Sequence, residues 1–125
     1  MARVLVVDDS LLQRKIIGGI LKAEGHEVIE ALDGQDGLEK ATSEKPDCIL
    51  SDLVMPKMDG FAFLAELKRS GLNIPIIVAT ADIQEDARQE CLDLGALHVI
   101  HKPIKKEDIL NALSRMLQPC QGKTK

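Results

Sequence analysis

Aromatic side chains are almost absent from this sequence. Its 125 residues include two phenylalanines and neither tyrosine nor tryptophan. The flat rings on which proteins stack the bases of single-stranded nucleic acid are therefore missing. A basic surface is missing as well, because 20 acidic residues outnumber 16 lysines and arginines and leave a net charge of −4. Proteins that bind nucleic acid through its phosphates need the opposite balance, so we expect no nucleic-acid partner.

Cysteines and long hydrophobic runs are also scarce. The three cysteines, Cys48, Cys91 and Cys120, are odd in number and have no C-x-x-C spacing. This pattern argues against a disulfide framework or a structural zinc site and favours a reducing cytosol. Cys48 and Cys91 fall in apolar patterns and are expected in the core. The apolar run Val4–Val7 is too short for a signal peptide or a membrane span, so we expect a cytoplasmic protein without membrane contact.

What the sequence does contain is a regular alternation of short β-branched runs and stretches of helical spacing. Strands are predicted at Arg3–Val7, Glu27–Ala31, Cys48–Ser51, Pro75–Ala79 and His98–His101. A helix is expected after each of them, which predicts a doubly wound α/β fold with a parallel sheet covered on both faces. The domain is assigned to residues 1–118, and residues 119–125 are expected to form a flexible polar tail.

The apolar residues of the predicted helices indicate which faces are buried. The first helix is expected to begin at the cap Ser10, to end at Gly25 and to bury Leu11, Leu12, Ile16, Ile17, Ile20 and Leu21. The third is expected to bury Phe61, Leu64 and Leu67, and the fourth Ile83, Ala87 and Cys91. Gly18 and Gly19 inside the first helix each cost about 1 kcal/mol relative to alanine, and close packing against a neighbour is the expected reason.

Chemically useful side chains occur where the predicted strands end. Asp8 and Asp9 follow the first strand, Asp52 the third, Thr80 the fourth and Lys102 the fifth. In an open parallel sheet, ligands bind beyond the carboxyl ends of the strands. Three neighbouring carboxylates need a counter-charge, and oxygen ligands without His or Cys favour Mg²⁺. The hydroxyl and the ammonium are then suited to contact a phosphoryl group placed on or beside a carboxylate.

Four ordered stretches make the chain resemble the receiver domain of bacterial response regulators. They are VLVVDDS (Val4–Ser10), ILSDLVMPKMDG (Ile49–Gly60), IIVATAD (Ile76–Asp82) and GALHVIHKP (Gly95–Pro103), and the similarity covers residues 3 to 117. The resemblance implies a flavodoxin-like fold of five helices and five strands in the order 2-1-3-4-5. Because no output domain is recognisable, we expect a single-domain member of the chemotaxis (CheY-like) type.

The resemblance also implies a role for each acidic residue. Asp52 would be the phosphoacceptor and would share in binding Mg²⁺. Asp9 would bind Mg²⁺ directly, Asp8 would assist through water, and the backbone carbonyl of Val54 would complete the protein ligands. Asp59, in contrast, is expected to start the following helix rather than to bind metal, and the three histidines show no ligand spacing.

The remaining site residues are implied to bind the phosphoryl group and to switch. Lys102 would pair with the phosphoryl oxygens, and Thr80 would donate its hydroxyl to one of them. In most members of the family a Tyr or Phe three positions before the lysine follows this movement, whereas this sequence has Val99. A valine lacks the hydroxyl contact of a tyrosine, worth about 1 kcal/mol. Pro103 matches a proline that often follows a cis bond, and Val54 and Asp82 stand where the family tunes phosphoryl lifetime.

The function implied is that of a phosphoacceptor signalling protein that catalyses only its own phosphoryl transfer and dephosphorylation. Its expected partners are a histidine kinase or phosphotransfer protein, a phosphatase, and a downstream protein that binds the last strand and the last two helices. Three alternatives remain: a pseudo-receiver that acts without phosphate, a phosphatase with an Asp nucleophile, and a flavin-binding protein. The phosphatase lacks the D-x-D-x-T motif, since Leu53 and Val54 follow Asp52, and no aromatic ring is available to cover a flavin.

Overall fold

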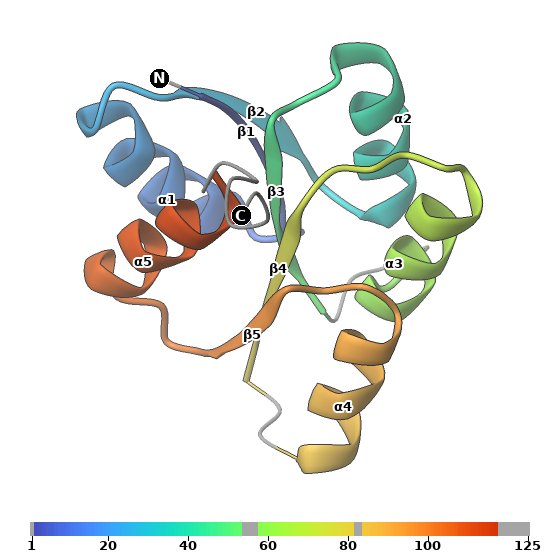
Figure 1. Ribbon diagram of the computed structural model, residues 1–125. Helices are drawn as coiled ribbons and strands as arrows, with labels where there is room; N and C mark the ends of the chain where they lie inside the picture. Colours follow the sequence, from blue (N-terminus) through green and yellow to red (C-terminus); the bar gives the residue numbers. More distant parts are fainter. Residues whose placement is uncertain (1, 54–57, 82–83, 118–125) are drawn as a thin grey trace, which may run out of the picture.

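Five parallel strands form one sheet in the order β2-β1-β3-β4-β5, with helices on both of its faces (Figure 1). The computed structural model describes residues 2–53, 58–81 and 84–117, which contain all of these elements. The strands are β1 (Arg3–Val7), β2 (Glu27–Ala31), β3 (Cys48–Asp52), β4 (Ile76–Thr80) and β5 (His98–His101). The helices are α1 (Leu11–Ala23), α2 (Gly34–Glu44), α3 (Gly60–Arg69), α4 (Glu85–Asp93) and α5 (Lys106–Met116). The flavodoxin-like fold and its strand order are thereby confirmed.

The strands differ from the predicted bounds only in β3 and β4. Each ends one residue later than predicted, β3 at Asp52 and β4 at Thr80, and β4 begins at Ile76 rather than at Pro75. Asp52 pairs with Ala79, and Thr80 pairs with His101. Two of the chemically useful residues are therefore held by the sheet register itself rather than by a loop beyond it.

Alternation of side chains along the strands divides the core into two layers. Leu5 and Val7 of β1 pack with residues of α2, α3 and α4 on one face, as Figure 1 shows for the helices. Val4 and Val6 of the same strand pack with residues of α1 and α5 on the other face. The inner strands β1, β3 and β4 are buried on both faces, which explains their nearly continuous apolar sequences.

Both described cysteines belong to this core, as predicted. Cys48 and Cys91 have no exposed surface. Burial raises the pKa of the Cys48 thiol to about 12, with a smaller contribution from the Asp47 carboxylate, and burial also raises the pKa of Cys91. Neither thiol is a nucleophile at neutral pH. Cys120 and the predicted tail lie outside the described residues, as does Ile83.

Helix α1 presents a different face to the sheet from the one predicted. Three of the residues expected in the core are 47–68% exposed, namely Leu11, Leu12 and Ile16. Ile17 and Leu21 are buried, and the position three residues before Ile17 on the same stripe is Arg14. The prediction counted apolar residues without dividing them between faces, and a helix of 3.6 residues per turn cannot bury all of them against one sheet.

The glycine pair in α1 also has a different explanation from the predicted one. A Cβ added at Gly18 would make only an ordinary contact with Val28, at 3.6 Å from Cγ1. A Cβ added at Gly19 would meet no atom within 4 Å. Close packing therefore does not require glycine at either position, and nothing in the structure explains the choice.

Helix α3 buries Phe63 rather than Phe61, the phenylalanine that was predicted to lie in the core. Phe63 has no exposed surface and is the largest fully buried side chain among the described residues, whereas Phe61 is half-buried against the same layer. Leu64 and Leu67 are buried as predicted. Asp59 caps this helix by accepting a hydrogen bond from the Ala62 amide at 2.9 Å, which confirms its structural role.

The predicted helix ends are confirmed at Ser10 and Gly25. The Ser10 hydroxyl accepts a hydrogen bond from the Gln13 amide at 3.2 Å, and Gly25 follows α1 with a φ of 87° that favours glycine.

Among the described residues, no helix combines the length and the apolar character needed to cross a membrane.

Candidate functional site

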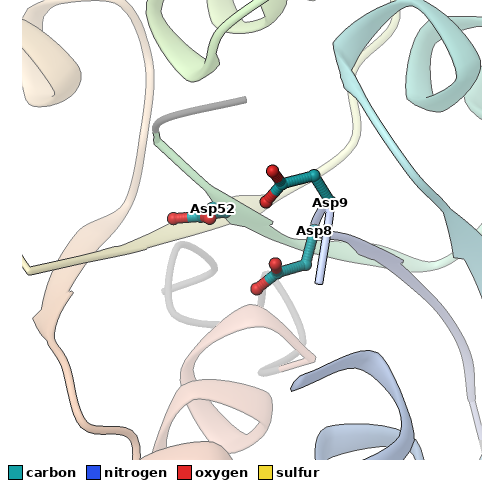
Figure 2. A group of neighbouring side chains, drawn as sticks. All are labelled: Asp8, Asp9 and Asp52. Atoms are coloured by element: carbon teal, nitrogen blue, oxygen red, sulfur yellow. The ribbon is translucent and has the colours of Figure 1, made fainter. Parts of the chain in front are cut away.

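Three carboxylates meet at the carboxyl edge of the sheet, where β1 and β3 lie side by side (Figure 2). Asp8 and Asp9 directly follow β1, and Asp52 is the last residue of β3. One carboxylate oxygen from each lies within 4.8 Å of the other two. Asp8 is buried, Asp52 is half-buried and Asp9 is exposed. In the part of the chain that the structure describes, this is the one acidic or His/Cys cluster of the size that holds a metal ion.

Lys102 supplies the cation that this cluster contains. Its Nζ lies 3.2 Å from Oδ1 of Asp52 and 3.4 Å from Oδ2 of Asp8. The lysine follows β5, and its amide donates a 2.8 Å hydrogen bond to the carbonyl oxygen of Thr80 at the end of β4. Its peptide bond with Pro103 is cis, as the family resemblance implied. Lys102 therefore lies at the same edge of the sheet as the acidic residues, and its contacts in this structure are with the carboxylates of Asp8 and Asp52.

The cluster carries more negative charge than Lys102 balances. Burial raises the pKa of the Asp52 carboxyl, the positive charge of Lys102 opposes this shift, and the negative charge of Asp8 adds to it. The Leu53 amide donates a 2.8 Å hydrogen bond to Oδ1 of Asp52 and favours the charged form. A further cation at this point would stabilise the ionised carboxylates.

The donor atoms fit a hard divalent cation. They are carboxylate oxygens from two adjacent strands, and no His or Cys side chain is among them. Asp9 is exposed and accessible to a hydrated ion, whereas Asp8 is buried. Mg²⁺ binds through one or two carboxylates and keeps several waters, so the arrangement suits Mg²⁺.

The two predicted switch residues, Thr80 and Val99, lie on the neighbouring strands β4 and β5. Thr80 is buried at the end of β4. Val99 is half-buried in β5 and packs with the layer formed by α2, α3 and α4. The predicted ligand Val54 and the predicted lifetime position Asp82 lie outside the described residues.

Backbone hydrogen bonds hold both described ends of the segment between Asp52 and α3. The Gly60 amide donates a hydrogen bond of 2.6 Å to the carbonyl oxygen of Leu53. The Gly34 amide, at the start of α2, donates one of 3.1 Å to the carbonyl oxygen of Met58. A Cβ at Gly34 would lie 2.4 Å from that same oxygen, so the approach requires glycine.

Arg14 also contacts the site, and the sequence analysis did not single it out. Its Nη1 donates a 2.6 Å hydrogen bond to the carbonyl oxygen of Asp8. The available signal was its position on the buried stripe of α1, three residues before Ile17 and seven before Leu21. A charged residue at such a position is rarely buried unless it has a partner.

The strand order and the charged residues at the carboxyl edge place the chain among flavodoxin-like α/β proteins that carry their site at that edge. The sequence matches the model of the response regulator receiver domain over residues 4–114, and the chain belongs to this family. Within the family it is CheY-like, as its relatives and structural neighbours are.

Two curated relatives illustrate the similarity. The chemotaxis protein CheY of Treponema pallidum is 39% identical over 119 residues, which cover 93% of this chain and 83% of that protein. A protein-glutamate methylesterase/protein-glutamine glutaminase of Treponema denticola is 40% identical over 124 residues, or 92% of this chain. The chain spans 33% of that longer protein, to which the enzymatic name belongs.

Solved structures give the same result. CheY4 of Vibrio cholerae superposes with a TM-score of 0.87 at 36% identity, and the match covers 94% of this chain and 99% of that one. CheY in the CheX–CheY complex of Borrelia burgdorferi with BeF₃ and Mg²⁺ superposes with a TM-score of 0.86 at 31% identity, covering 90% and 87%.

Proposed function

We propose that the chain accepts a phosphoryl group on Asp52 from a histidine kinase or phosphotransfer protein, with Mg²⁺ as cofactor. The observation that carries this proposal is the contact of 3.2 Å between Lys102 and Asp52 inside a cluster of three carboxylates. The Lys102 ammonium orients the acceptor oxygen of Asp52, and the three carboxylates keep enough negative charge to bind a metal ion. The bound BeF₃ and Mg²⁺ in the complex from Borrelia burgdorferi support this assignment by similarity.

The transfer uses few groups, and Asp52 has two tasks in it, as the nucleophile and as a ligand of the metal ion. An oxygen of the Asp52 carboxylate attacks phosphorus in line, the bond from phosphorus to the donor imidazole nitrogen breaks, and that nitrogen keeps the electron pair. Lys102 pairs with a phosphoryl oxygen, and the Thr80 hydroxyl donates to another. Mg²⁺, when bound, neutralises charge on the phosphoryl oxygens; Asp9, Asp52 and the Val54 carbonyl would hold it, with Asp8 acting through water.

Signalling would follow from the new charge on Asp52. Thr80 moves toward the phosphoryl group, and β5 with Val99 follows, which changes the surface formed by α4, β5 and α5. A downstream protein binds this surface, and a phosphatase resets the acceptor. The protein acts in the cytoplasm through residues 1–118 and turns over no separate substrate.

Exposed apolar residues next to the acidic cluster support a protein as phosphodonor. Leu11 and Leu12, in the first turn of α1, are 59% and 68% exposed, and Ile16 one turn later is 47% exposed. Apolar groups gathered in this way on a surface commonly mark a protein contact. A donor seated on this part of α1 would present its histidine to the neighbouring Asp52.

The test is phosphorylation by acetyl phosphate and Mg²⁺, followed by mass spectrometry. Asp52→Asn should abolish the added phosphoryl group, whereas Asp59→Asn, a change at an exposed cap, should leave it in place. Undiminished labelling of Asp52→Asn would contradict the proposal. A wild-type chain in which neither Mg²⁺ nor beryllofluoride shifts any amide resonance would instead favour the phosphate-independent pseudo-receiver.

A further inference from the structure

Arg14 joins the acidic end of β1 to the edge strand β2. Arg14 is largely but not fully buried, with 12% of its side chain exposed. Nη1 donates a 2.6 Å hydrogen bond to the backbone carbonyl of Asp8, and Nε donates one of 3.0 Å to Oε1 of Glu30. Removing a guanidinium from water costs free energy unless its N–H groups find acceptors. Here Nε and Nη1 each have one.

The carbonyl that Arg14 holds belongs to the peptide between Asp8 and Asp9. The other polar groups of Asp8 are also occupied: its amide donates to the Ala31 carbonyl at 3.0 Å, and Oδ1 accepts from the Ser10 amide at 2.9 Å. Oδ2 accepts from Lys102 at 3.4 Å. Because a peptide unit is planar, fixing the Asp8 carbonyl also fixes where the amide and Cα of Asp9 lie.

Glu30 determines how Arg14 is oriented. Its second carboxylate oxygen accepts a 3.0 Å hydrogen bond from Lys15, and its backbone carbonyl accepts one of 2.9 Å from Lys40. The hydrogen bond from Lys15 is the largest influence that lowers the pKa of Glu30, burial opposes it, and the hydrogen bond from Arg14 acts in the same direction as Lys15. Both oxygens of the Glu30 carboxylate thus have a partner, Arg14 on Oε1 and Lys15 on Oε2, and the carboxylate is a defined anchor for the arginine.

We infer that Arg14 is a positioning residue for the cation site: it orients the Asp8–Asp9 peptide so that both carboxylates face one metal ion. This inference rests on the proposed function, in which Asp8 and Asp9 serve Mg²⁺. It makes a prediction opposite to that of simple electrostatics. A nearby positive charge repels a cation, so removing Arg14 should strengthen Mg²⁺ binding if charge were its only effect. Loss of orientation should weaken binding instead.

The experiment is a titration of the unphosphorylated protein with Mg²⁺ alone, followed by amide chemical shifts. Arg14→Met should raise the dissociation constant about tenfold or more, the usual result of removing a group that orients metal ligands. Arg14→Lys should give an intermediate value, because one ammonium keeps the charge but cannot reach both acceptors. Lys15→Met, which removes a charge bound to the same Glu30 without touching Asp8, should stay within about twofold.

Urea unfolding of each variant separates orientation from stability, since a loss of stability alone lowers the midpoint and leaves the dissociation constant unchanged. If Arg14→Met does not fold, Arg14→Lys carries the test. Equal or tighter Mg²⁺ binding by the folded arginine variants would overturn the inference while leaving the proposed function intact. A wild-type chain that binds no Mg²⁺ would contradict the proposed function and the role of Arg14 with it.

Discussion

Lys102 lies with its ammonium 3.2 Å from the carboxylate of Asp52, although Asp52 ends β3, Lys102 follows β5, and β4 lies between these two strands. The lysine also approaches Asp8 at 3.4 Å, so it links the ends of β1, β3 and β5. Lys102 therefore balances part of the negative charge of the three carboxylates, and the charge that remains suits a bound metal cation.

Replacing Lys102 should make the folded state depend on Mg²⁺. Lys102→Met leaves the carboxylates of Asp8 and Asp52 without their counter-charge and should lower the free energy of unfolding by about 2 kcal/mol in EDTA, less than for a fully buried pair because the lysine is partly exposed. Saturating Mg²⁺ should remove much of this loss, as measured by urea unfolding. Lys22→Met, at an exposed position of α1, serves as the control. A deficit that is the same with and without Mg²⁺ would contradict the counter-ion role.

The Thr80 hydroxyl should have two roles: it binds the phosphoryl group, and it transmits the conformational change to β5 and α4. Thr80→Val keeps the shape of a residue that is 3% exposed and removes its hydroxyl. Beryllofluoride should bind more weakly by about 1 kcal/mol, the value of one hydrogen bond, and the amide shifts that it causes in β5 and α4 should largely disappear. Thr80→Ser, which keeps the hydroxyl, should restore those shifts. Full wild-type shifts in Thr80→Val would show that the hydroxyl is not the transmitter.

Two glycine-to-alanine substitutions in helices should have opposite effects. Gly34→Ala places a Cβ against the Met58 carbonyl and should destabilise the protein by about 1–3 kcal/mol. Gly19→Ala fills open space on an exposed helix position and should stabilise it by about 1 kcal/mol. Urea unfolding measures both. The same sign for the two changes would show that backbone contact at the start of α2 does not determine the result.

The two phenylalanines of α3 should differ in their effect on stability. Phe63→Ala empties a fully buried position and should cost about 3–5 kcal/mol. Phe61→Ala, at a half-buried position of the same helix, should cost about 1–2 kcal/mol. Thermal unfolding followed by circular dichroism compares them directly. Equal losses would indicate that Phe61 is buried in solution as deeply as Phe63.

The ion pairs that Glu30 forms with Arg14 and Lys15 should make the stability of the folded state depend on pH. Its hydrogen bond with Lys15, opposed by burial and aided by Arg14, lowers the pKa of Glu30 below its ordinary value of 4.5. The folded state therefore holds the proton less tightly than the unfolded chain. The resulting stability is fully present above pH 4.5 and is lost as the pH falls through the lowered value.

Glu30→Gln should accordingly destabilise the protein most at neutral pH. Its difference from wild type in free energy of unfolding should shrink as the pH falls below 4.5, as urea titrations at each pH would measure. Glu39→Gln, at an exposed position of α2, serves as the control and should differ little from wild type at any pH. A Glu30→Gln deficit that grows in acid would reverse the assigned sign.

The sequence was sufficient to predict the strands and the residues at their ends. Short, nearly continuous β-branched runs between stretches of helical spacing are typical of buried parallel strands, and parallel strands bring Asp8, Asp52 and Lys102 to one edge whatever the details of packing. The strand order required the family resemblance, because alternating strands and helices alone are compatible with several orders.

Helix faces were harder to predict. In α1, Leu11 and Leu12 have the same hydropathy as Leu21, and only the angle around the helix axis determines which of them meets the sheet. In α3, Phe61 and Phe63 are two positions apart, so only the packed structure shows which is buried. Arg14 escaped notice for the same reason, since its role depends on a backbone carbonyl and on a partner in β2.

The division of the core into two layers has a consequence for β5. Val99 belongs to the layer of α2, α3 and α4, whereas the next residue, Ile100, belongs to the layer of α1 and α5. Strand β5 has one strand neighbour, so among the described strands it is a sheet edge. A sideways displacement of this strand shears both layers in the same movement. Such a displacement would therefore act at once on α4 and on α5, which lie on opposite faces of the sheet.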